Sequence, residues 1–173
     1  MFSVLKKIAK IGIVSEDLIQ LSPQDEEFNK LGLALKTEIS QHFSGSVAIR
    51  AVDSGSCNGC ELEIHAINNA FYNAEQYGIH FVASPRHADI LLVTGPVSKH
   101  MEDALLRAYQ AMPAPKWVIA MGECAIDGGI FGENYATLGA VEKVIPVDLH
   151  IQGCPPTPTQ LLQGILTLLS HTK

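Results

Sequence analysis

This sequence lacks any apolar run close to the roughly 20 residues that a membrane-spanning helix needs. Its first fourteen residues carry scattered lysines but neither a long apolar segment nor paired arginines, which argues against a secretory or twin-arginine signal. Basic residues are not in excess either: 12 Lys and Arg stand against 18 Asp and Glu, which argues against a nucleic-acid partner. The protein is therefore expected to stay in the cytoplasm, where thiols are kept reduced and structural disulfides are rare.

Charged residues are scarce as well. They make up 17% of the chain against 47% apolar residues, so a packed globule is expected rather than a disordered chain. The length of 173 residues suits one domain with a proper core. We divide the sequence into an N-terminal helical extension, residues 1–45, and one α/β domain, residues 46–173.

The N-terminal extension holds two apolar patterns at helical spacing. The first combines lysines and apolar residues in a short amphipathic segment: Lys6, Lys7 and Lys10 with Leu5, Ile8, Ile11 and Val14. Such a helix rests on a membrane surface or a partner subunit, or it packs on its own domain. The second pattern follows Pro23, spans residues 24–43, and repeats Phe28, Leu31, Leu35 and Ile39. This stripe indicates ordinary packing, with an interface as the alternative.

From residue 47 onward, strand and helix patterns alternate. Apolar runs predict five strands, over residues 47–52, 79–83, 89–94, 117–121 and 147–151. The run at 89–94 is apolar on both faces, as in a buried parallel strand. Strands that alternate with helices at this spacing predict βαβ units. The expected fold class is therefore α/β, with a flavodoxin-like, doubly wound and mainly parallel sheet after the helical extension.

Three helices are expected within this domain. Apolar spacing predicts the first over residues 61–77, closed by Gly78, and the second over residues 97–112. The last helix starts with residues typical of a capping box, in which the N-cap, first and third positions are Thr157, Pro158 and Gln160.

Only four cysteines are present, and all of them follow predicted strands: Cys57, Cys60, Cys124 and Cys154. The carboxyl ends of parallel strands lie along one edge of a sheet, which is where open α/β sheets bind ligands. The cysteine-bearing segments are therefore expected to converge. Four thiolates at one point repel each other unless a cation or a cluster holds them, so we interpret the four as one metal site.

Three chemistries compete for these cysteines. A [4Fe-4S] cluster takes four thiolates and tolerates ligands far apart in sequence, and we favour it. A structural zinc takes the same four ligands but usually from two close pairs, whereas a long segment separates Cys124 from Cys154. A thioredoxin-like redox pair at Cys57 and Cys60 would leave the other two cysteines without a role.

The glycines beside the cysteines suit a bulky cofactor. Gly59 is expected to relax the turn between Cys57 and Cys60, so that amide hydrogens point inward. The helix that follows would aim the positive end of its dipole at an anionic cluster. Gly122 and Gly153 are expected to let the backbone approach it closely.

Several sequence segments together resemble one known family. They are SCNGCE at 56–61, SPRHADILLVTG at 84–95, MGEC at 121–124, VIPVD at 144–148 and GCPPT at 153–157. As a set they are similar to the family shared by [NiFe]-hydrogenase small subunits and a small, cluster-bearing subunit of complex I. The resemblance covers roughly residues 47–169. It implies that Cys57, Cys60, Cys124 and Cys154 bind one proximal [4Fe-4S] cluster.

Within this family, the chain most resembles the small subunits of membrane-bound, energy-converting hydrogenases of the formate hydrogenlyase and Ech type. Complex I subunits of the family have adjacent cysteines at the first position, whereas Cys57 and Cys60 are spaced as in hydrogenases. Exported uptake hydrogenases carry further cysteines in a C-terminal part, but no cysteine follows Cys154 here. The resemblance therefore implies a single cluster.

The resemblance also implies a function and a set of partners. The chain would be an electron-transfer subunit of an oxidoreductase complex, passing electrons between ferredoxin-like iron-sulfur subunits and the nickel-iron site of a hydrogenase large subunit. Integral membrane subunits would hold the complex at the cytoplasmic side of the membrane. Two alternatives stay open: a subunit of a quinone-reducing, complex I-like oxidoreductase, and a zinc-stabilised structural subunit.

Other polar residues near the motifs allow more than one role. The guanidinium of Arg86 would offset the charge of a cluster and raise its reduction potential, unless Arg86 is simply a surface residue. The histidines 65, 87 and 150 are more typical of surface positions than of proton relays. The glutamates 61, 63 and 123 either relay protons or stabilise the first turn of a helix. The glycine-rich loop from Gly128 to Gly132 has no phosphate fingerprint, so we expect it to pack near the cluster or contact a partner.

Overall fold

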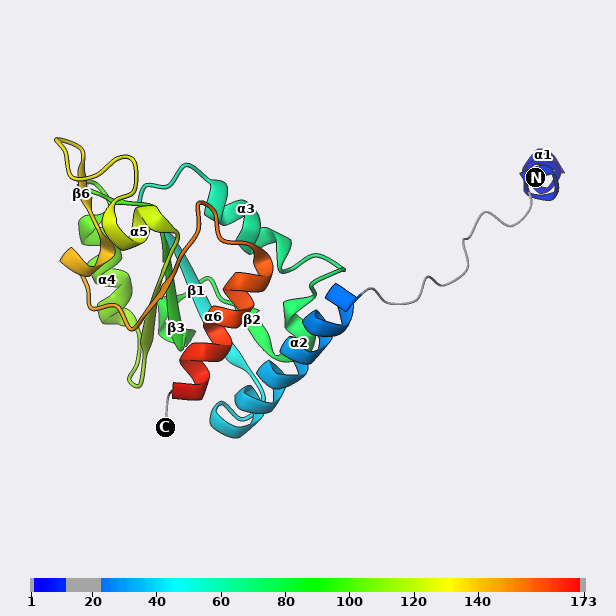
Figure 1. Cartoon of the computed structure of the whole chain (residues 1–173), viewed down its shortest axis with the longest axis horizontal. Coiled ribbons are helices and arrows are strands. Elements are labelled where there is room, and N and C mark those ends of the chain that lie inside the picture. The colour runs from blue at the N-terminus through cyan, green and yellow to red at the C-terminus, as the bar shows by residue number, and fades with distance from the viewer. Residues whose placement is uncertain (1, 12–22, 172–173) are drawn as a thin grey trace.

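The computed structural model describes residues 2–11 and 23–171. In its main body, one sheet lies between two groups of helices (Figure 1). Five parallel strands form this sheet, in the order β2-β1-β3-β5-β7. They are β1 Val47–Asp53, β2 Ile79–Phe81, β3 Ile90–Thr94, β5 Trp117–Met121 and β7 Leu149–Ile151. Because this is the flavodoxin-like order, the predicted fold class is confirmed.

The central strand β3 explains why the sheet forms here. All five of its residues are buried, and it pairs with β1 on one side and β5 on the other. Both of its faces are apolar, as the sequence predicts, because helices cover both sides of the sheet. The edge strands β2 and β7 are three residues long, so each is shorter than the apolar run that predicts it.

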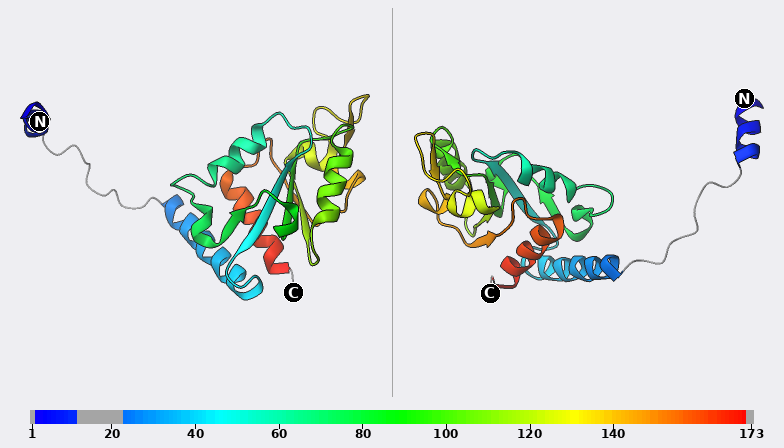
Figure 2. Two further views of the ribbon diagram at one scale, coloured as in Figure 1. Left: turned by 180° about the vertical axis from the view of Figure 1, so that it is seen from behind. Right: turned by 45° about the horizontal axis from the view of Figure 1, so that its top comes forward.

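Two hydrophobic cores lie on the two faces of the sheet, as the views in Figure 2 show. On one face lie α2 Pro23–His42, α3 Gly59–Ala66 and α6 Pro158–His171, which contribute Leu35, Ile64 and Leu161. On the other face lie α4 Glu102–Ala111, α5 Glu123–Asp127 and η3 Val141–Lys143, which contribute Leu105, Ala125 and Val141. The sheet is therefore doubly wound.

The start of α6 is set by side chains, as predicted. The Thr157 amide donates to Gln160 Oε1 at 2.8 Å, and the Gln160 amide donates to Thr157 Oγ1 at 3.3 Å. This reciprocal pair is a capping box, with Pro158 as the first helical residue. It fixes where the chain enters the helix, three residues after Cys154.

The helix expected over residues 61–77 is wrong in its second half. Helix α3 ends at Ala66, and the 3-10 helix η1 Ala74–Tyr77 follows after a series of turns. The Asn69 side chain accepts hydrogen bonds from the amides of Phe71 and Tyr72, so it replaces the helical hydrogen bonds there. Phe71, which follows α3 in these turns, is exposed.

The second expected helix, over residues 97–112, begins later than predicted. Its first residues form the short strand β4 Val97–Ser98, which pairs antiparallel with β6 Thr137–Gly139. This two-stranded sheet lies outside the central one and brings the segment after α5 back beside the start of α4. The predicted sheet lacks it, because both strands are too short to give a periodic pattern.

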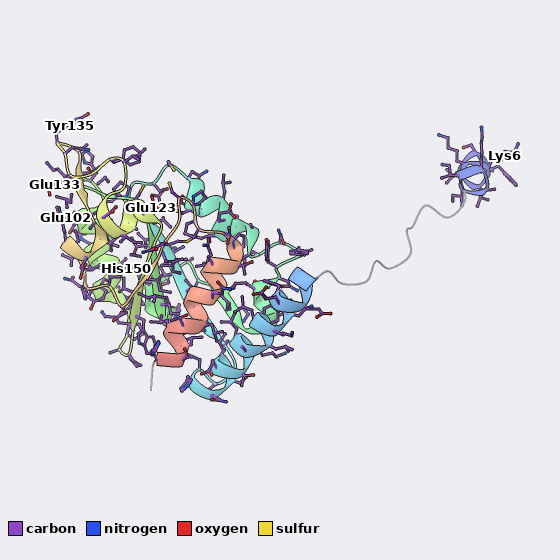
Figure 3. All side chains as sticks on the ribbon, viewed as in Figure 1. Lys6, Glu102, Glu123, Glu133, Tyr135 and His150 are labelled. Atoms are coloured by element: carbon purple, nitrogen blue, oxygen red, sulfur yellow. The ribbon has the colours of Figure 1, made fainter. Side chains whose placement is uncertain are left out.

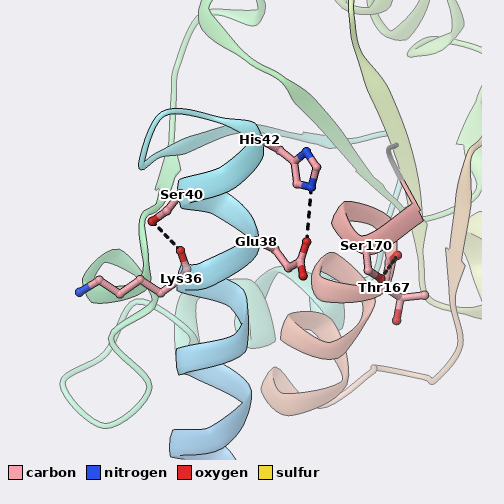
Figure 4. A network of polar contacts seen from close by, with 6 residues as sticks. All are labelled: Lys36, Glu38, Ser40, His42, Thr167 and Ser170. Atoms are coloured by element: carbon pink, nitrogen blue, oxygen red, sulfur yellow. Dashed lines mark hydrogen bonds and ion pairs between the residues drawn. The ribbon is translucent and has the colours of Figure 1, made fainter.

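In the described part of the N-terminal extension, residues 2–11 and 23–45, the structure shows two helices. Helix α2 packs along α6. Within α2, the Ser40 hydroxyl donates a hydrogen bond to the Lys36 carbonyl, and the His42 side chain pairs with the Glu38 carboxylate (Figure 4). The stripe predicted on this helix therefore serves ordinary packing: Phe28, Leu35 and Ile39 are buried.

The other helix, α1 Phe2–Ile11, buries none of its residues. Of the amphipathic pattern predicted there, Val14 lies outside the described residues. Across residues 2–11 and 23–171, no helix has both the length and the hydrophobicity needed to cross a membrane.

Candidate metal centre

All four cysteines line one cavity at the carboxyl edge of the central sheet. Cys57 lies in the loop after β1, Cys60 in the first turn of α3, Cys124 in α5 after β5, and Cys154 in the loop after β7. The volume of the cavity is about 90 Å³. We call it the cysteine cavity. It is lined by Ser56, Cys57, Gly59, Cys60, Gly95, Gly122, Glu123, Cys124, Gly153, Cys154 and Pro155.

The four thiols differ in depth. Cys60 and Cys124 are partly buried, whereas Cys57 and Cys154 are exposed, and all four are free of disulfides. The thiol of Cys60 also contacts the carbonyl of Met121, the last residue of β5, at 3.8 Å. One side of the cavity is therefore backed by the sheet, and the other opens to the surface.

The thiol pKa values show that the cysteines affect one another. Burial raises the pKa of Cys60 to about 12, and the charges of Glu61 and the other three cysteines add to the rise. Burial also raises the pKa of Cys124, with further contributions from Cys154 and Cys57. A cation placed among them would remove this repulsion, because metal binding selects the thiolate form.

Glycines keep the walls of the cavity open. A Cβ at Gly122 would lie 2.8 Å from Cys60 Sγ, and one at Gly129 would lie 2.8 Å from Cys124 Sγ. Both glycines have positive φ, of 89° and 53°. At Gly153, where φ is 136°, a Cβ would meet the backbone of Pro156 at 2.6 Å. A side chain at any of these positions would displace a thiol or the loop that carries Cys154.

The turn between Cys57 and Cys60 is built differently from the prediction. The left-handed residue is Asn58, with φ of 71°, and it is the N-cap of α3. Gly59 is the first helical residue and lines the cavity, where a Cβ would meet Cys57 Sγ at an ordinary 3.5 Å. Asparagine tolerates the left-handed conformation well, so this turn does not need its glycine to adopt it.

A polar network that the sequence analysis did not predict holds this turn in place. The carboxylate of Glu61 accepts hydrogen bonds from the hydroxyls of Ser56, at 2.6 Å, and Thr94. Thr94 is the last residue of β3 and is buried. Asp53 Oδ1 accepts from the amides of Gly55 and Ser56, at 2.8 and 2.7 Å. The cluster of Asp, Ser and Gly at 53–56 is a signal of such side-chain-capped turns.

The remaining predicted residues lie away from the cavity lining. Arg86 is exposed and lies in η2 Pro85–His87, which precedes β3, whereas the cysteines follow their strands. Its effect on a cluster therefore stays a prediction. The three histidines of the sequence analysis, His65, His87 and His150, are exposed.

The loop after α5 forms an apolar surface beside Cys124. Gly128 ends α5, and the exposed apolar residues Ile130 and Tyr135 follow. Figure 3 shows Tyr135 and Glu133 at the tip of this loop, beyond Glu123. The Lys143–Glu133 pair ties the loop to η3 at 2.5 Å. The loop lies close to Cys124, because a Cβ at Gly129 would lie 2.8 Å from Cys124 Sγ. The expectation that it packs near a cluster or contacts a partner stays a prediction.

A single metal ion and a cluster place different demands on four cysteines. A zinc ion needs all four sulfurs about 2.3 Å from one point. Within the described part of the chain, no three His, Cys, Asp or Glu side chains are grouped so that they could hold one metal ion. In a cluster each thiolate binds its own iron, so the sulfurs stand further apart around a common cavity. The four cysteines do line one common cavity.

Comparison with known proteins places the chain in a family. Residues 57–168, which include all four cysteines, match the family described as NADH ubiquinone oxidoreductase, 20 Kd subunit. The chain belongs to this family. The resemblance to a complex I subunit that the sequence motifs predict is thereby confirmed.

Two relatives of this chain are subunits of hydrogen-metabolising complexes. Formate hydrogenlyase subunit 7 of Escherichia coli is 45% identical over 136 residues, which cover 79% of this chain and 53% of that protein. A probable membrane-bound hydrogenase subunit of Pyrococcus furiosus is 47% identical over 118 residues, covering 68% of this chain and 71% of that protein. The chain thus spans about half the length of the first relative.

A solved structure of the same fold comes from a complex with different chemistry. It is a chain of the membrane-bound sulfane sulfur reductase, described as an archaeal respiratory membrane complex. The TM-score is 0.65 at 33% identity, over 80% of this chain and 74% of that one. Proteins similar to this chain therefore occur in more than one kind of membrane oxidoreductase complex.

Proposed function

We propose that this chain is the electron-transfer small subunit of a membrane-bound [NiFe] hydrogenase complex and holds one proximal [4Fe-4S] cluster. The observation that carries the proposal is that four cysteines from three distant segments line one cavity. Family membership and the similarity to two hydrogenase-complex subunits support it.

Five residues of the cysteine cavity have a distinct part in this proposal. Cys57, Cys60, Cys124 and Cys154 would each bind one iron, and Gly122 would leave room beside Cys60. A bound cluster supplies reversible uptake of one electron. The chain itself performs no bond chemistry in this proposal: its residues hold the cluster, limit its contact with water and present it to a partner.

The proposed partners follow from what the chain does not contain. It has no cysteine beyond these four, so a nickel-iron site would belong to a separate large subunit. Electrons would pass between that subunit and a ferredoxin-like subunit. Integral membrane subunits would hold the assembly at the cytoplasmic side of the membrane. The relative from P. furiosus, described as a probable membrane-bound hydrogenase subunit, supports the association with a membrane complex.

A second function has its own support. The 33% identity to a chain of the sulfane sulfur reductase and the family description favour a subunit of another complex I-like oxidoreductase, such as a quinone-reducing one. The sequence of the copurifying large subunit decides between the two. Cysteine pairs able to bind nickel support the hydrogenase, and their absence supports the alternative.

The cluster itself is tested by chemical analysis of the anaerobically purified protein. About four iron atoms and four acid-labile sulfides per chain are expected. Stoichiometric zinc without sulfide would overturn the proposal in favour of a zinc-stabilised structural subunit.

A further inference from the structure

Helix α1 has two chemically different sides. At 100° per residue, its five large apolar residues fall on one half of the helix, and its three lysines fall on the opposite side. The apolar residues are 56–82% exposed: Phe2, Val4, Leu5, Ile8 and Ile11. The basic residues are Lys6, Lys7 and Lys10, and Figure 3 shows Lys6 on this helix.

This helix needs a surface that covers its apolar side. A free helix of ten residues is shorter than the roughly 12–15 residues at which isolated helices become marginally stable in water. The other amphipathic helices have such cover: α6 buries six residues, including Leu161 and Leu162. In α1 no residue is buried.

The charge of α1 indicates what that surface is. The helix carries three of the 12 basic residues of the chain and none of its 18 acidic ones, in a protein of net charge −6. If the apolar side docked on a protein, the lysines would face away from the contact. At an anionic lipid surface, by contrast, the apolar side enters the acyl boundary while the lysines reach the headgroups.

We propose that α1 is an interfacial anchor that lies flat on anionic lipid. Its apolar side would be buried at the headgroup boundary and its lysines would contact lipid phosphates. The contact would be peripheral. The proposal rests on α1 alone and not on the cluster, so it stands or falls independently of the proposed function.

The test is cosedimentation of the full-length protein with vesicles of phosphatidylcholine, with and without roughly 30% phosphatidylglycerol. We expect binding that needs the anionic lipid and weakens with salt. Leu5→Gln should weaken it roughly tenfold, since it removes buried apolar area. Lys6→Gln, Lys7→Gln and Lys10→Gln should each weaken it roughly fivefold.

Leu33→Gln is the matched control, because Leu33 is an equally exposed leucine, on α2. It should leave vesicle binding unchanged, and circular dichroism melting should show that all variants keep their fold. The proposal is overturned if the wild-type protein does not cosediment with vesicles. That result would mean that the apolar side of α1 binds a partner subunit or a second copy of the chain. It is also overturned if binding is equal with and without phosphatidylglycerol, or if Leu33→Gln weakens it as much as Leu5→Gln.

Discussion

The two sides of the cysteine cavity differ in how firmly the fold holds them. Cys60 and Cys124 are partly buried against the sheet, next to glycines that leave no room for a side chain. Cys57 and Cys154 are exposed, on loops. The packing of the domain therefore fixes the positions of the inner pair, Cys60 and Cys124. The outer pair, Cys57 and Cys154, is accessible to solvent or to a partner protein at this edge of the sheet. A site for electron transfer benefits from both, since it needs a fixed cofactor and a short path to a partner.

The largest expected effect comes from removing one thiol on each side. Cys60→Gly and Cys154→Gly should both lose the intact four-iron cluster, because each leaves an iron without its ligand. Only Cys154→Gly should recover it when a small thiol such as 2-mercaptoethanol is added, since Cys154 is exposed. Iron content and the electron paramagnetic resonance (EPR) signal measure this. Equal rescue of both variants would remove the distinction between inner and outer ligands.

Crowding of the inner side gives the next largest effect. Gly122→Ala should block cluster incorporation, because its Cβ would lie 2.8 Å from Cys60 Sγ. Gly132→Ala is the control: Gly132 also has positive φ, but a Cβ there would meet nothing within 4 Å. It should cost only about 1 kcal/mol of backbone strain and keep its iron. Normal iron content in Gly122→Ala would contradict this prediction, because it would show that the backbone at residue 122 can move away from Cys60.

The two glutamates beside the inner cysteines form a matched pair. Glu61 follows Cys60 and is bonded to Ser56 and Thr94, whereas Glu123 precedes Cys124 and is exposed. Glu61→Gln should raise the midpoint potential of the cluster more than Glu123→Gln, because solvent screens the exposed carboxylate. Redox titration followed by EPR measures both. A larger shift of the midpoint potential for Glu123→Gln would mean that the hydrogen bonds and burial of a carboxylate do not determine its effect on the cluster.

In the metal-free protein, the inner and outer cysteines should also differ in how fast they react with an alkylating reagent. At pH 8, alkylation should be slower at Cys60 than at Cys154, because burial raises the pKa of Cys60 to about 12 and leaves little thiolate. The fold thus favours the protonated thiol. The protonated Cys60 thiol therefore contributes to the free energy of unfolding. This contribution is complete below the ordinary pKa of 9.0 and is lost as the pH rises toward 12, because the unfolded chain releases this proton first. Mass spectrometry of timed alkylation measures the first effect, and melting at pH 8 and pH 10 measures the second.

Arg86 should give the smallest effect. It lies before β3, at the opposite end of the strand from Thr94, so Arg86→Met should lower the midpoint potential less than Glu61→Gln raises it. The same titration tests this. A shift as large as that of Glu61→Gln would mean that the guanidinium acts on the cluster over a longer range than its position suggests.

The order of the strands and the convergence of the cysteines could be predicted because both follow from local patterns. Apolar runs mark β1, β5 and β7, and the carboxyl ends of parallel strands always meet at one edge. The bonds of Glu61 could not be predicted, since they depend on Thr94, 33 residues away on β3. The expectation that Gly59 relaxes the turn between Cys57 and Cys60 also missed that Asn58 is its left-handed residue.

Helices α1 and α2 show a further limit of sequence patterns. Both have apolar residues at helical spacing, but Leu35 and Ile39 of α2 are fully buried while α1 buries nothing. Periodicity tells which side of a helix is apolar. It does not tell whether the same chain covers that side, because this depends on the tertiary contacts of the helix.

The position of Cys154 has a consequence for how the protein is made. It follows β7, which is an edge strand of the sheet within the described residues and pairs there with β5 through three residues. A chain emerging from the ribosome therefore presents three thiols before the fourth, and the cysteine cavity is complete only when the last strand adds to the sheet. A cluster held by all four cysteines would therefore form only after β7 and Cys154 have been made and have joined the folded sheet.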